Sequence, residues 1–136
     1  MSKVYDLIPY ISVGDIKFGM TKTDLVDVFS KEPDLVSVSF SKRTTLEWGT
    51  IKVRLNKKGL VDEVSFIDDC SVLCDGMDIF NDLKTIKELT KREKPYNTVG
   101  FKVFFEFGIA ITGFSTKKDY KSLSVFSKEL INVWKS

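Results

Sequence analysis

The sequence predicts an α+β fold in which two or three helices pack on one antiparallel sheet of about six strands. Several short runs alternate apolar and polar residues, which is typical of half-buried strands, while other runs space apolar residues as amphipathic helices do. The chain has 136 residues, with 43% hydrophobic and 29% charged residues, as globular proteins have. We therefore expect a single domain over residues 1–136, built as two helix-then-meander halves.

The first predicted helix covers residues 22–30. Residues 1–19 are expected to be irregular, because Pro9 breaks any helix. Thr21 and Asp24 then stand three residues apart, as the two partners of a capping box do, and apolar residues follow at helical spacing.

A hairpin is the clearest element of the first half. Two alternating runs, 51–55 and 60–67, flank the turn sequence Asn56-Lys57-Lys58-Gly59. Residues 35–40 form a further alternating run that predicts a strand with its apolar side chains on one face. Gly49, between this strand and the hairpin, marks a bulge or bend.

The second half repeats the order of a helix followed by strands. Its apolar spacing predicts a helix over residues 79–91 and a short last helix after Ser127. Alternation and turn glycines predict three strands between these helices, over residues 101–107, 109–114 and 120–126.

The residue types present argue against an enzyme. The chain contains no histidine, which removes Ser-His and Cys-His nucleophiles and most zinc sites. Cys70 and Cys74 are wrongly spaced for a redox motif, and no glycine-rich phosphate loop occurs. The aspartates of residues 68–78 do not follow the calcium-loop pattern. We expect no catalytic residue, no metal and no cofactor.

Charge is distributed unevenly along the chain. Residues 60–83, the acidic segment, contain seven acids and no lysine or arginine, whereas the whole chain has 21 basic and 19 acidic residues. Most such runs are simply solvated, but an acidic surface can also attract a basic partner and speed its association. Trp48 is a natural anchor for such an interface if it is exposed.

Two further patterns concern location. No apolar run approaches the 18 residues of a membrane span, and the N-terminal residues lack the pattern of a secretion signal. Two cysteines do not make a disulfide framework. We therefore expect a cytoplasmic protein that does not contact a membrane.

Several segments, spread over nearly the whole chain, resemble those of bacterial immunity proteins, which are encoded beside toxins in polymorphic and contact-dependent growth inhibition systems. The Gly19-Met20-Thr21-Lys22 helix start is also similar to that of β-lactamase-inhibitor-protein-like domains. The segments that carry the resemblance are Gly14–Lys22, Asp24–Phe29, Val64–Ile67, Gly76–Phe80 and Phe105–Ala110. The resemblance implies a cytosolic protein without catalytic residues that blocks a cognate toxin domain by binding it.

The predicted function is therefore neutralisation of a cognate toxin C-terminal domain by occlusion of its active site. A nuclease is the expected toxin, because its cleft is positive and would attract an acidic inhibitor. The predicted partner-binding residues are Asp62, Glu63, Asp68, Asp69, Asp75, Asp78, Asp82 and Trp48. The alternative is a small nucleic-acid- or ligand-binding module, although the basic residues are scattered rather than gathered in one patch.

Overall fold

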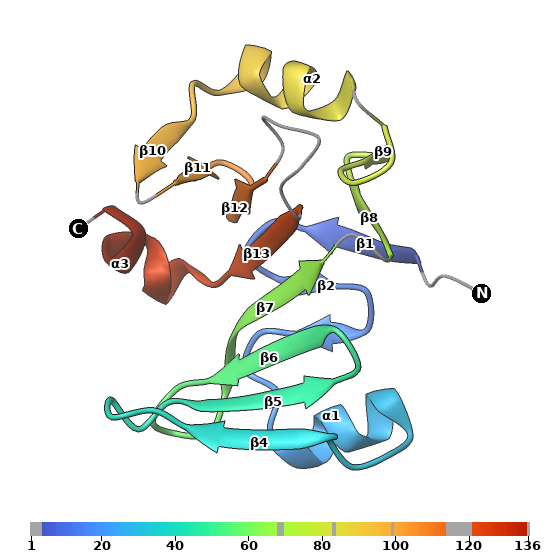
Figure 1. The fold of residues 1–136 in the computed structure, drawn as a ribbon, viewed down its shortest axis with the longest axis vertical. Coiled ribbons are helices and arrows are strands. Elements are labelled where there is room, and N and C mark those ends of the chain that lie inside the picture. Colours follow the sequence, from blue (N-terminus) through green and yellow to red (C-terminus); the bar gives the residue numbers. More distant parts are fainter. Residues whose placement is uncertain (1–3, 68–69, 83, 99, 114–120, 136) are drawn as a thin grey trace.

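The computed structural model describes residues 4–67, 70–82, 84–98, 100–113 and 121–135. These residues form an eight-stranded sheet in the order β10-β11-β12-β13-β7-β6-β5-β4, and a five-stranded sheet in the order β3-β2-β1-β8-β9 (Figure 1). The α+β class is confirmed. The single sheet of about six strands is wrong, because strands that pair across the two halves of the chain extend one sheet and build a second.

The strands are short, and three helical segments connect or follow them. The eight-stranded sheet contains β4 (Leu35–Val38), β5 (Thr44–Trp48), β6 (Ile51–Leu55), β7 (Val61–Ile67), β10 (Tyr96–Thr98), β11 (Phe101–Phe104), β12 (Ile109–Thr112) and β13 (Ser122–Phe126). The five-stranded sheet contains β1 (Val4–Ile8), β2 (Ser12–Val13), β3 (Ile16–Lys17), β8 (Ser71–Cys74) and β9 (Met77–Asp78). The helices are α1 (Lys22–Phe29), α2 (Lys84–Arg92) and a 3₁₀ turn η1 (Lys128–Leu130) that runs into α3 (Ile131–Lys135).

Residues 4–17 contain three short strands, against the expectation of an irregular start. In β1, buried Tyr5 and Leu7 alternate with exposed neighbours, and Pro9 follows the end of the strand. β1 pairs in parallel with β8, whose residues are far away in the sequence. That long-range partner is the reason why local pattern did not reveal the second sheet.

The capping box at the start of α1 is confirmed. Thr21 Oγ1 accepts a hydrogen bond from the backbone N–H of Asp24, and the Asp24 carboxylate accepts one from the backbone N–H of Thr21. Leu25 is the fully buried residue of this helix. A cap of this kind stabilises a helix by about 1 kcal/mol, which helps a helix of only eight residues to form.

The predicted hairpin forms β6 and β7. Asn56 Oδ1 accepts hydrogen bonds from the backbone N–H groups of Lys58 and Leu60, and Gly59 adopts a φ of 79° that favours glycine. Gly49 is not a bulge, because it lies in the tight turn between β5 and β6, with Trp48 paired to Ile51. β4, β5, β6 and β7 are therefore a continuous meander.

The helix predicted over residues 79–91 begins later, at Lys84. Asp78 Oδ1 accepts hydrogen bonds from the backbone N–H groups of Phe80 and Asn81, and this turn competes with helix at the same residues. Ile79 and Phe80 still enter the core, but from the turn.

The main hydrophobic core lies between the two sheets and includes Leu25 of α1 and Leu89 of α2. A smaller cluster lies where η1 and α3 cover the other face of the eight-stranded sheet, and it contains Val103, Ala110, Phe126 and Leu130. Figure 1 shows α3 beside the half of the sheet formed by β10 to β13, away from β4. The β4 edge is therefore far from this cover.

Candidate functional site

The acidic segment does not form one solvated surface. Asp62 and Glu63 lie in β7, an interior strand, and are only 4% and 7% exposed. The Asp62 carboxylate is 2.5 Å from Arg43, and the Glu63 carboxylate is 3.1 Å from Arg54. The prediction that these two acids contact a partner from a solvated face is wrong, because both are internal ion-pair members.

Burial controls the titration of these two acids. It raises the pKa of the Asp62 carboxyl, although the hydrogen bond from Arg43 opposes the change. Burial also raises the pKa of the Glu63 carboxyl, against the attraction of Arg54 and Arg43. The Asp62 and Glu63 carboxylates form ion pairs with arginines of the same chain. Neither carboxylate is therefore exposed to a partner protein.

The other predicted acids lie near the start of α2. The Asp75 carboxylate is 2.6 Å from Arg92, and Asp82 accepts a hydrogen bond of 2.9 Å from the backbone N–H of Lys84. Asp78 organises the turn described above. Asp75, Asp78 and Asp82 thus share one region with Arg92 and the lysines of α2, whereas Asp68 and Asp69 lie outside the described residues.

Trp48 is not an exposed anchor. Its side chain is only 3% exposed and stacks on Phe29, with ring centroids 4.4 Å apart and planes 8° apart. Its indole Nε1–H donates a hydrogen bond of 3.0 Å to the Lys31 carbonyl. Trp48 therefore fixes the end of α1 against β5, and the exposure that an anchor role requires is absent.

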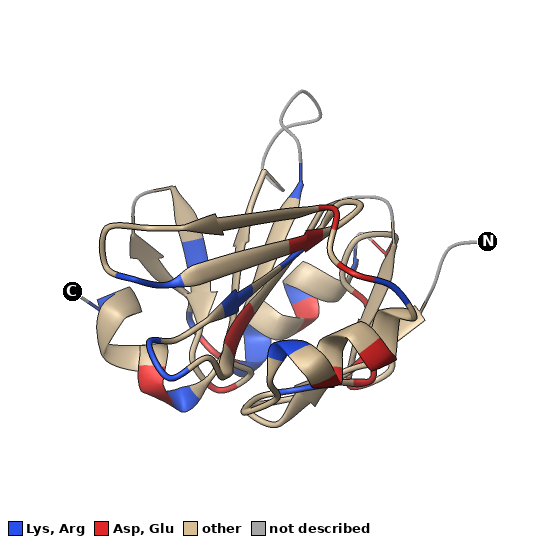
Figure 2. Cartoon of the chain, turned by 90° about the horizontal axis from the view of Figure 1, so that it is seen from below, with Lys and Arg blue, Asp and Glu red and all other residues tan. Residues whose placement is uncertain are grey.

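Sequence reasoning missed one apolar surface feature, the β4 strip, which we define as Leu35, Val36, Val38 and Phe40. The first three side chains are 61%, 53% and 65% exposed, and Phe40 is fully exposed. β4 is an edge strand, whose one sheet neighbour among the described residues is β5. In Figure 2, which views the molecule from this side, charged residues flank β4 but none lies within it.

The open side of β4 also presents backbone groups. The Ser39 N–H donates a hydrogen bond of 2.9 Å to the Arg43 carbonyl, and Ser37 and Leu35 pair with Thr45 and Glu47. Hydrogen-bonded pairs alternate along an antiparallel ladder, so Leu35 and Ser37 direct their backbone groups toward β5. The N–H and C=O groups of Val36 and Val38 then point outward, ready to pair with another strand.

A sequence signal for this strip did exist. Residues 35–41 contain no charged residue, although natural edge strands usually carry lysine, proline or another device against pairing. The alternation of Val36, Val38 and Phe40 predicted a strand correctly, but it did not show that the strand lies at an edge. An apolar face of an edge strand is buried only where another element covers it, and alternation does not reveal that cover.

The described residues give little support to a metal site, a reactive thiol or a membrane span. There, no three acidic or cysteine side chains are grouped so that they could hold a metal ion. Cys70 and Cys74 are buried free thiols, and burial raises the pKa of Cys74 to about 11, which keeps that thiol protonated. No helix in the described ranges has the length and apolar character needed to cross a membrane.

Comparisons of the chain with models of protein families, with curated proteins and with solved structures found no match.

Proposed function

We propose that this domain is an immunity protein that binds a cognate bacterial toxin domain through the β4 edge, in the cytoplasm of the producing cell. The observation that carries the proposal is the β4 strip, an exposed apolar edge strand with outward backbone groups. The resemblance to immunity proteins supplies the class of partner. The mode of binding is addition of a strand of the toxin to the eight-stranded sheet.

A protein partner fits this surface better than a nucleic acid does. Strand addition satisfies the outward N–H and C=O groups of Val36 and Val38, and the neighbouring apolar side chains lose their contact with water. A nucleic acid requires lysine or arginine side chains against its phosphates, and residues 35–41 contain none. The β4 strip thus selects a strand with apolar side chains.

The β4 edge replaces the acidic segment as the proposed contact surface. Asp62 and Glu63 are buried, so two of the acids on which the nuclease prediction rested do not face a partner. The proposal therefore specifies a toxin domain that is blocked by binding, without specifying the reaction that the toxin catalyses.

The test uses the toxin domain encoded beside this chain and a double variant, Val36→Lys with Val38→Lys. Two charges on the strip should weaken binding by about a hundredfold or more, since each buried charge would lack a partner. Cells that express the toxin should then no longer be rescued by the variant.

The matched control is Val4→Lys with Ile8→Lys. These residues are also exposed valine and isoleucine side chains, 60% and 50%, but they lie on β1, which is interior to the five-stranded sheet. The control should bind and rescue like the wild type. Toxin binding by the β4 variant as tight as that of the wild type would contradict the proposal. Light scattering that shows the β4 strip binding only a second copy of this chain would also contradict it.

A further inference from the structure

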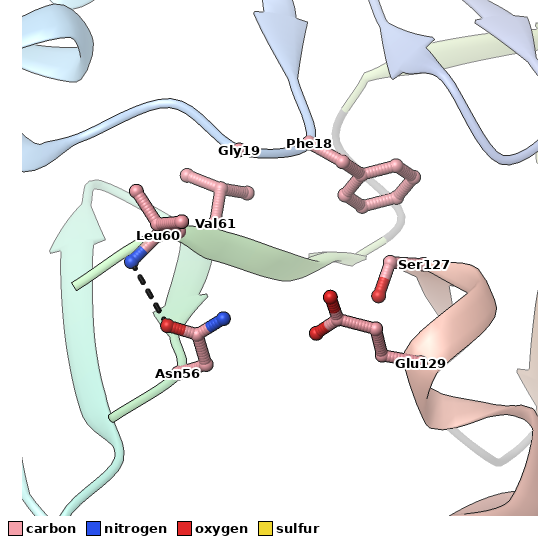
Figure 3. A pocket seen from close by; sticks show the side chains of 7 residues that line it. All are labelled: Phe18, Gly19, Asn56, Leu60, Val61, Ser127 and Glu129. Atoms are coloured by element: carbon pink, nitrogen blue, oxygen red, sulfur yellow. Dashed lines mark hydrogen bonds between the residues drawn. The ribbon is translucent and has the colours of Figure 1, made fainter. Parts of the chain in front are cut away.

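A small pocket lies where three segments that are far apart in the sequence meet. The first segment is the connection between β3 and α1, which provides Phe18 and Gly19. The second is the β6–β7 turn, which provides Asn56, Leu60 and Val61. The third is the start of η1, which provides Ser127 and Glu129 (Figure 3). We call it the Ser127 pocket. Its volume is about 190 Å³, which is below the range of roughly 300–1,000 Å³ for cofactor and drug sites and suits a single side chain.

Backbone hydrogen bonds hold the three walls together. The Gly19 N–H donates to the Val61 carbonyl at 2.9 Å, and the Val61 N–H donates to the Met20 carbonyl at 2.8 Å. The Ser127 N–H donates to the Asp62 carbonyl at 2.9 Å. Because each bond joins two walls, the pocket is a built feature of the fold.

Ser127 contributes an unused hydrogen-bonding group. Its side-chain Oγ is buried, the residue is 8% exposed, and no hydrogen-bond partner for Oγ exists among the described residues. A buried hydroxyl without a partner is costly, and native proteins usually avoid it. The hydroxyl therefore marks a position where a ligand atom would be stabilised.

Glu129 and Asn56 converge on the same space. Figure 3 shows the Glu129 carboxylate directed toward Ser127, with the Asn56 amide nitrogen on the opposite side. The Asn56 amide oxygen is already occupied by the Leu60 and Lys58 N–H groups, which fixes the amide orientation. Glu129 forms no ion pair with any described residue, so its charge is available to a ligand.

We propose that the Ser127 pocket binds the guanidinium group of an arginine side chain from a polypeptide partner. The Glu129 carboxylate would accept two N–H bonds from the guanidinium, and Ser127 Oγ would accept a third. A planar guanidinium stacks on an aromatic ring, which Phe18 provides, and the aliphatic part of arginine matches Leu60 and Val61. A phosphate or carboxylate ligand is disfavoured, because Glu129 repels it.

The site is separate from the β4 edge, so the two proposals can fail independently. N-acetyl-arginine-N-methylamide is the probe, and backbone amide NMR signals of the full chain are the readout. The probe should produce saturable shifts at Gly19, Val61, Ser127 and Glu129, with a dissociation constant of about a millimolar, as few contacts allow. The Val36→Lys, Val38→Lys variant should bind the probe like the wild type.

Two variants test the chemistry. Glu129→Gln should weaken probe binding about tenfold, because it removes the charge from the principal acceptor. Ser127→Ala should weaken binding a few-fold while the free protein stays as stable as the wild type, since the lost hydroxyl had no partner. Glu32→Gln, an exposed acid before β4, is the matched control and should leave binding unchanged.

Three results would overturn the guanidinium assignment. The first is the absence of saturable shifts with the arginine probe. The second is an equal response to N-acetyl-norleucine-N-methylamide, which has a similar length and no charge. The third is a Glu129→Gln variant that binds the arginine probe as tightly as the wild type does.

Discussion

The two edges of the eight-stranded sheet differ in how they are protected. At one edge, β10 has only three residues, follows Lys94 and Pro95, and is tied to the C-terminal helix by a hydrogen bond of 3.0 Å from the Tyr96 hydroxyl to the Lys135 carbonyl. At the other edge, β4 also follows a proline and a charged residue, Pro33 and Asp34, but it is four residues long and all four are exposed. One sheet thus has one guarded edge and one open edge.

Edge strands template unwanted pairing, so proteins normally guard them. The β10 edge is guarded in this way. The Tyr96 ring also packs on Phe105, with centroids 5.8 Å apart, and Glu93 accepts hydrogen bonds from the Phe105 and Glu106 N–H groups. This contrast between the two edges supports the proposal that the β4 edge is a binding surface.

The largest expected effect is the difference between proline substitutions at two positions of β4, one whose N–H faces β5 and one whose N–H points away from the sheet. Ser37→Pro removes an N–H that faces β5 and should lower the free energy of unfolding by about 2 kcal/mol. Val36→Pro removes an outward N–H, so stability should be preserved while toxin binding weakens about tenfold. Urea unfolding and calorimetric titration measure the two quantities. The reverse assignment, with Val36→Pro unstable and Ser37→Pro neutral, would show that the ladder has the opposite phase.

The interior strand β7 provides the next contrast, through the pH dependence of stability. Burial raises the pKa of the Glu63 carboxyl, so the folded protein binds this proton more tightly than the unfolded chain does. Its contribution to stability is complete below the unfolded pKa of about 4.3 and is lost as the pH rises through the higher folded pKa.

Glu63→Gln should remove that dependence. The free energy of unfolding of the variant, relative to the wild type, should increase as the pH rises from about 4 through the range where buried Glu63 ionises. Glu47→Gln, on strand β5, is the control for the same substitution two strands away from β7. A constant difference across this pH range would mean that burial does not govern the titration of Glu63.

A substitution at the β10 edge should change stability and toxin binding less than the substitutions in β4 do. Tyr96→Phe removes the hydrogen bond to the Lys135 carbonyl and should cost about 1 kcal/mol of stability or less, because the bond is exposed. Toxin binding should stay within about twofold of the wild type, since β10 lies at the far edge from β4. A large loss of binding would place the partner on the wrong edge.

The smallest expected effect concerns the acids near α2. Reversing Asp75 and Asp82 to lysine should leave toxin binding within about twofold, because these side chains serve an ion pair and a turn rather than the proposed contact. Surface plasmon resonance at low salt is the measurement, since weak steering is largest there. A loss of tenfold or more would restore the acidic segment as the binding surface.

Local features of this fold could be predicted from the sequence, and non-local ones could not. The capping box of Thr21 and Asp24 and the hairpin around Asn56 depend on neighbours in the sequence, and both are present. The parallel pairing of β1 with β8 joins residues about 67 positions apart, so no local period reveals it.

The burial of Asp62 and Glu63 could not be predicted for the same reason. β4 and β7 both show apolar alternation, yet β4 is an open edge and β7 is buried on both faces. Their difference comes from the order of strands in the sheet, which decides whether Val36 faces water and whether Glu63 meets an arginine. The number of acidic residues in 60–83 does not indicate which of them are buried.

Amide hydrogen exchange of β4, measured by NMR in the free protein and in the complex with the proposed toxin partner, tests the β4 edge most directly. In the free protein, the outward amides of Val36 and Val38 should exchange rapidly, while those of Leu35 and Ser37 should be protected by β5. The complex should protect Val36 and Val38 as well. Unchanged exchange at these two amides, with new protection at residues 75–82 instead, would contradict binding through β4.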